Sequence, residues 1–171
     1  GKDLLGLSVA VAGVGVAITS MVKSYAKFAP VQRNFNKLIG SDAKDSIEEF
    51  RKASYGLIDD FALMKNANLL FMNIATATPD QFAKMTRASV LLDRAVGIDA
   101  TEAFERLTLG IAKGETELID ELGLKLDATV ANRLYAESVG KSVSELTAAE
   151  RATAALNAIM PVLEERIGSL N

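Results

Sequence analysis

The sequence predicts an all-α protein, and three observations support that prediction. Large apolar residues recur three and four positions apart along most of the 171-residue chain, which is the period of a helix buried on one face. No segment alternates with period two for more than a few residues outside the first predicted helix. Helix-start residues precede these apolar stripes and glycines follow them. We expect long N-terminal helices, forming a helical hairpin or a coiled coil, followed by a compact bundle of short helices.

The composition narrows the possible functions. The chain is 49% hydrophobic with 12 Gly and 3 Pro, which is typical of a folded protein rather than a disordered one. It starts with Gly1 rather than Met, so we expect an excised fragment. It contains no Cys and no His, which removes thiol chemistry, the commonest general base and the commonest metal ligand. We therefore expect no enzyme, no metal and no cofactor, since Gly13-Val14-Gly15 lacks the third glycine of a dinucleotide-binding turn.

The charge is unevenly distributed. The net charge is −3, but residues 1–40 carry five basic residues and one acidic residue, while the rest carries 14 basic and 21 acidic residues. An acidic chain argues against sequence-specific binding of nucleic acid.

The first predicted helix is uncharged from residue 4 to residue 22 and is followed by a basic flank. Those 19 residues just reach the length of about 20 that a membrane-spanning helix needs. Small residues form a second stripe on this helix, which allows close packing against another helix, in a membrane or in a soluble protein. Burial against the next helix is favoured because Gly and Ser weaken the tendency of the run to insert into a membrane. The small-residue stripe consists of Gly6, Ala10, Gly13, Ala17 and Ser20.

Pro30 is expected to end or bend this first helix. From Ile47 to Ala75 the apolar residues then alternate at spacings of three and four through four heptads, and this heptad stripe predicts one long helix. It could be a coiled-coil seam between copies, with Asn68 fixing the register, or one face of a helix buried in its own domain. Its central members are Phe50, Leu57, Phe61, Met64, Asn68 and Phe71.

Shorter helices are predicted after residue 77. Thr78-Pro79-Asp80-Gln81 is a strong helix start, and Thr147-Ala148-Ala149-Glu150 is a second capping box. The expected helices run from 79 to 96, 99 to 113, 116 to 122, 128 to 139 and 147 to 167, the last kinked at Pro161. We divide the chain into residues 1–76 and 77–171. Four of the expected helices end at C-cap glycines, namely Gly97, Gly114, Gly123 and Gly140.

One stretch also resembles a known family. A helix ends at Gly114, a short helix leads into Leu122-Gly123-Leu124, and Asn132-Arg133-Leu134-Tyr135-Ala136 leads to Gly140-Lys141 and Leu146-Thr147. This order is similar to that of the tail tape measure proteins of long-tailed bacteriophages, over residues 78–163. The resemblance implies a structural protein of the virion that lies in the tail lumen, sets tail length and leaves during DNA ejection.

The resemblance also implies partners and places. These are other copies of the chain, the tail tube and tail tip proteins and the tail assembly chaperones. The host inner membrane is a further possible partner, suggested by the uncharged run 4–22, its small-residue stripe and its basic flank. Before assembly the protein would be in the host cytoplasm. A single continuous helix of this length would reach about 250 Å, but the Gly and Pro breaks predict a bundle in isolation. The alternative is a helical protein-binding module, an adaptor or a chaperone-like protein.

Overall fold

A computed structural model of the chain describes residues 26–170. The uncharged run 4–22 and its small-residue stripe, Gly6, Ala10, Gly13, Ala17 and Ser20, lie outside the described residues.

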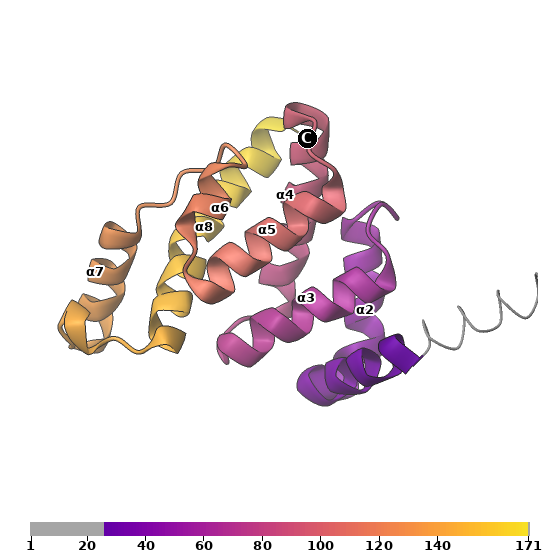
Figure 1. Cartoon of the computed structure of the whole chain (residues 1–171), viewed down its shortest axis with the longest axis horizontal. Helices are drawn as coiled ribbons and strands as arrows, with labels where there is room; N and C mark the ends of the chain where they lie inside the picture. Colours follow the sequence, from indigo (N-terminus) through magenta and orange to yellow (C-terminus); the bar gives the residue numbers. More distant parts are fainter. Residues whose placement is uncertain (1–25, 171) are drawn as a thin grey trace, which may run out of the picture.

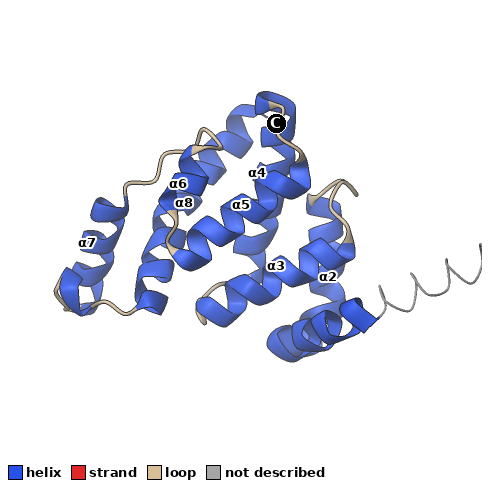
Figure 2. Cartoon of the chain, viewed as in Figure 1, coloured by secondary structure: helices blue, strands red, loops and turns tan. Residues whose placement is uncertain are grey.

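The described residues are helical, with short connections and no strand between residues 26 and 170 (Figure 2). This confirms the all-α prediction for that part of the chain. A helix at 26–39 leads through the 3₁₀ turn η1 (Gly40–Asp42) into the bundle, and η2 (Val143–Glu145) precedes the last helix. Seven α-helices follow η1 in the described residues (Figure 1): α2 (Ala43–Ala53), α3 (Asp60–Asn73), α4 (Pro79–Val96), α5 (Ala100–Lys113), α6 (Thr116–Asp120), α7 (Ala128–Val139) and α8 (Ala148–Leu170).

The prediction of one long helix from Ile47 to Ala75 is wrong. The chain leaves α2 after Ala53 and enters α3 at Asp60, and the two helices lie as separate elements in Figure 1. Tyr55 and Gly56 both have positive φ, 52° and 73°, which no α-helix can contain. The Asp59 side chain accepts a hydrogen bond from the backbone N–H of Ala62 at 2.8 Å and so caps the start of α3.

A bidentate ion pair holds this α2–α3 corner. Arg51 donates from Nε to Asp60 Oδ1 at 2.8 Å and from Nη2 to Asp60 Oδ2 at 2.7 Å. Tyr55 has a positive φ, which non-glycine residues rarely adopt. Its ring packs against the guanidinium of Arg87, whose Cζ atom lies 4.4 Å from the ring centroid. Arg87 Nε also donates to the backbone carbonyl of Ala53 at 3.2 Å. The corner is therefore tied to α4 as well as closed on itself.

The Arg51–Asp60 pair makes stability depend on pH. The hydrogen bond that Arg51 donates to the Asp60 carboxylate holds the pKa of Asp60 below its ordinary value. A carboxyl whose pKa is lowered by folding stabilises the fold above its unfolded pKa, about 3.9, and loses that contribution as the pH falls through the folded pKa.

Asp60→Asn is accordingly expected to lower the free energy of unfolding by about 0.5–1 kcal/mol at pH 7. The effect is small because both side chains of the pair are more than a third exposed, so that solvent screens their attraction. Urea unfolding at pH 7 and again at a pH low enough to protonate Asp60 in the folded protein measures this, and the difference from the unaltered protein should shrink at the lower pH. Glu137→Gln, which removes a carboxylate from the exposed side of α7, is the matched control. An equal loss for Asp60→Asn at both pH values would contradict the assigned role of the charge.

The first described helix runs through Pro30 to residue 39, so Pro30 does not end it. The break comes instead at Gly40, whose φ is +78°. Asp42 stands at the N-cap position of α2, but its side chain makes no capping bond there.

Most of the helix starts and stops expected after residue 77 are confirmed. Thr78 and Gln81 form a reciprocal capping box at the start of α4, and Thr147 and Glu150 exchange the corresponding bonds at the start of α8. α6 is shorter than expected and ends at Asp120, while α8 continues past Pro161. Three of the four expected C-cap glycines, Gly97, Gly114 and Gly140, are the left-handed C-caps of α4, α5 and α7. Gly123 has a φ of 75° but does not cap α6, because that helix ends at Asp120 with Glu121 as its C-cap and a turn separates it from the glycine.

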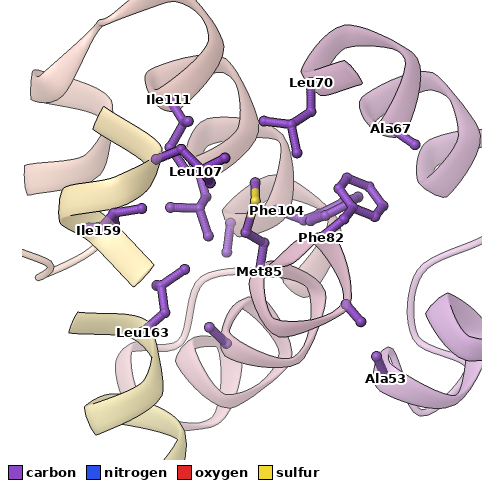
Figure 3. Close-up of a cluster of buried hydrophobic side chains, with 14 of the residues drawn as sticks. Ala53, Ala67, Leu70, Phe82, Met85, Phe104, Leu107, Ile111, Ile159 and Leu163 are labelled. Atoms are coloured by element: carbon purple, nitrogen blue, oxygen red, sulfur yellow. The ribbon is translucent and has the colours of Figure 1, made fainter. Parts of the chain in front are cut away.

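One hydrophobic core unites the described residues on both sides of residue 76. Phe82 of α4 is fully buried, and its ring centroid lies 4.6 Å from that of Phe50 in α2 and 5.2 Å from that of Phe104 in α5. Figure 3 shows Phe82 and Phe104 meeting Leu70 of α3, with Ile159 and Leu163 of α8 closing the other side. The division after residue 76 therefore does not separate two cores in the described part of the chain.

Candidate functional site

The stretch that resembles the tape measure family folds around a cleft. The end of α5, the first turn of α7 and the first two turns of α8 meet there, together with Asn73 at the end of α3. The cleft has a volume of about 340 Å³, within the range of about 300–1,000 Å³ that is usual for small-molecule sites. Of the four cap glycines, only Gly114 lines it.

Small side chains create the space in this cleft. Its walls carry alanines from three helices, where larger residues would close the gap. The apolar lining is Ala112, Leu126, Ala128, Ala131, Ala148 and Ala155, and the polar lining is Asn73, Lys113, Thr116, Asn132 and Arg151.

The charges that line the cleft are both positive. Arg151 uses Nη2 to donate to the backbone carbonyl of Val143 at 2.9 Å, which holds its guanidinium against η2. Neither Arg151 nor Lys113 forms an ion pair with another residue in the range 26–170. No carboxylate lines the cleft.

The carboxylates that flank the cleft in sequence have other partners. The Asp127 side chain caps α7 by accepting from the backbone N–H of Val130 at 3.1 Å. Glu150 accepts from the backbone N–H of Thr147 and from Lys141 Nζ, and these bonds lower its pKa in that order of importance. Glu115 and Glu117 line a neighbouring hollow that shares Gly114 and Thr116 with the cleft.

A second hollow, of about 350 Å³, lies between α2, α4 and the end of α8, and it differs from the cleft in its charge. Lys84 bridges Asp80 and Glu164 here, at 3.2 and 3.0 Å. The hydrogen bond with Glu164 is the main reason that the pKa of Lys84 is raised. Acidic and basic groups neutralise one another in this hollow.

Most of the predicted heptad stripe faces the protein's own core. Phe50, Met64 and Asn68 are buried, and Phe61 and Phe71 are partly buried. Asn68 Nδ2 donates to the carbonyl of Val31 at 3.0 Å and so ties α3 to the helix at 26–39. The exception is Leu57, which lies in the α2–α3 corner and is 53% exposed.

An apolar surface remains on α7, which packs on α8 and not on the centre of the bundle (Figure 1). Leu134 is 54% exposed and Val130 lies one turn before it on the same face. Leu134 also borders a shallow groove between α7 and α8, with a volume of about 190 Å³.

The sequence did not reveal the role of Gly110. This glycine lies inside α5, and a Cβ atom placed on it would be 2.6 Å from Cγ1 of Ile119 and 3.1 Å from the carbonyl oxygen of Glu115. It therefore lets the α6 segment pack directly on the last turns of α5. No local signal distinguishes such a glycine from one that merely weakens a helix.

Two other features are not found among the described residues. Between residues 26 and 170, no three acidic side chains come together to hold a metal ion, and no helix is long and apolar enough to cross a membrane. Comparison with known proteins gave no match to a family model, to a curated protein or to a solved structure.

Proposed function

We propose that this chain is a segment of a phage tail tape measure protein, a structural component of the virion. The observation that carries the proposal is the order of helix ends over residues 78–163, on which the resemblance rests. Local structure supports it, because three glycines of that stretch, Gly97, Gly114 and Gly140, end helices and its capping boxes begin them. The proposed partners are the tail tube, the tail tip and the assembly chaperones.

If the chain is part of a ruler, the compact bundle is the form that it takes before it enters the tail tube or outside it. A ruler adds about 1.5 Å of length per residue only where its chain is a continuous helix. In the bundle, by contrast, α4, α5 and α8 pack side by side in one core. The segment would therefore have to open its core to contribute to tail length.

A deletion in the phage genome that encodes this chain tests the proposal. Removing the codons for residues 78–163 should shorten the tails, measured by electron microscopy, by about 130 Å if the segment is extended in the tube. An insert of equal length, made of regular helical heptads, should restore the length. Unchanged tail length would reject the ruler role of the segment, and absence of the protein from purified particles would reject the virion role altogether.

Residues 4–22 are proposed to enter the host inner membrane during DNA delivery. The test is flotation of the full chain with liposomes, compared with a version that lacks residues 1–22. The truncation stops there because Phe28 packs against Phe61, with ring centroids 6.3 Å apart, and belongs to the folded part. Flotation of both versions to the same extent would reject the membrane role.

The exposed apolar face of α7 favours the alternative, a helical protein-binding module. Size-exclusion chromatography with light scattering separates the two proposals. A defined oligomer of this chain supports assembly in a tail, whereas a monomer that binds another protein supports an adaptor.

A further inference from the structure

We propose that the cleft between α5, α7 and α8 is a binding site for a carboxylate, carried either by a small organic acid or by an acidic peptide segment. This proposal does not depend on the tail function. It follows from the charge, the available hydrogen-bond donors and the shape of the cleft.

The first argument is charge. The chain as a whole is acidic, at −3, yet the cleft is lined by two cations and no anion. Lys113 and Arg151 come from the end of α5 and the start of α8, so the fold brings them to one cleft from positions far apart in the sequence. Two cations that line one cleft with no anion beside them favour a ligand of negative charge.

The second argument is the set of free donors. Arg151 donates one hydrogen bond from Nη2 to the carbonyl of Val143, and this bond holds the side chain in place. The other N–H groups of the guanidinium can donate to a ligand. A guanidinium held in this way matches the two oxygens of a carboxylate. Among the other lining residues, Asn132 of α7 offers an amide and Thr116 of α6 offers a hydroxyl.

The third argument is shape. Alanines form much of the wall, so the cleft can admit the short carbon chain that a carboxylate carries. A mixed lining of apolar walls with a few polar groups is typical of a site for an organic ligand. Inorganic phosphate would leave those apolar walls without a partner, and for this reason we assign the site to a carboxylate.

The test is calorimetric titration of the full chain with three probes: succinate, a blocked hexaglutamate peptide and inorganic phosphate. We expect succinate or the peptide to bind, with affinity reduced about tenfold or more in Lys113→Gln and in Arg151→Gln, since each removes a charge-assisted hydrogen bond. Lys44→Gln, which removes an exposed charge on α2 outside the cleft, should bind as the unaltered chain does.

A variant that fills the space without changing charge locates the ligand. Ala128 is only partly buried and lines the cleft, so Ala128→Leu should remain folded, with a far-ultraviolet circular dichroism spectrum like that of the unaltered chain, and should lose binding. Binding of succinate alone identifies a small acid, and binding of the peptide alone identifies an acidic segment. No binding by either, tighter binding of phosphate, or unchanged binding by folded Ala128→Leu would each overturn the proposal.

Discussion

Replacement of Phe82 by alanine is expected to lower the free energy of unfolding by about 3–5 kcal/mol, which is the usual cost of emptying a fully buried phenylalanine site. Phe82 has no exposed surface, and its ring contacts the phenylalanine rings of three other helices. A domain of this size is stable by only about 5–15 kcal/mol, so the loss is a large fraction of the total. Urea denaturation followed by circular dichroism measures it. The rings concerned are those of Phe50 in α2, Phe71 in α3 and Phe104 in α5.

Two further variants make this experiment decisive. Phe82→Leu keeps most of the apolar volume and should cost less, which provides a measurable value should Phe82→Ala not fold. Met72→Ala, at a side chain that is 66% exposed, should change stability by less than about 0.5 kcal/mol. If Phe82→Ala cost no more than Met72→Ala, Phe82 would not be the centre of a shared core.

Gly110→Ala is expected to destabilise the protein, although alanine favours helices by up to about 1 kcal/mol over glycine. The new methyl group would meet Cγ1 of Ile119, which is fully buried, and the backbone oxygen of Glu115. Neither atom is the free end of a flexible side chain. Overpacking of this kind costs about 1–3 kcal/mol, so we expect a net loss of about 1–2 kcal/mol by urea denaturation.

A double-mutant cycle with Ile119→Ala tests the cause. Truncation of Ile119 removes both atoms of its side chain that crowd the new methyl group, Cγ1 and Cδ1. Gly110→Ala should therefore cost less in the Ile119→Ala background than alone, by about 1 kcal/mol. Equal costs in the two backgrounds would show that contact with Ile119 is not the reason for glycine at this position.

The short helices could be predicted because their signals are local. A capping box such as Thr78 with Gln81 satisfies backbone groups within one turn, and the residues that make it are three positions apart in sequence. The left-handed glycines likewise act on the helix that they end. The same holds for the apolar period: Ala152, Leu156, Ile159 and Leu163 of α8, spaced three and four apart, are all buried.

The α2–α3 corner could not be predicted from spacing. Leu57 keeps the heptad register although it lies in a turn, so the stripe continues in the sequence through a place where the chain bends back. The groups that favour the bend act over longer ranges: Arg51 reaches Asp60, and Arg87 comes from another helix. An apolar pattern contains no information about such contacts.

The cleft could not be predicted from the sequence either. Asn73, Lys113, Asn132 and Arg151 belong to four different helices, and only the packing of the bundle brings them together. Lys113 and Arg151 each resemble any surface charge when considered alone. Their common environment emerges from tertiary structure.

The single core has a mechanical consequence for a protein proposed to work as a ruler. Because Phe82 joins α4 to α2, α3 and α5, pulling one helix away exposes the contact surfaces of the others. Small domains of this kind open in an all-or-none manner. Under tension such a segment would add its full length in one step or none at all, and it would act as a latch with a force threshold, not as a spring that yields gradually.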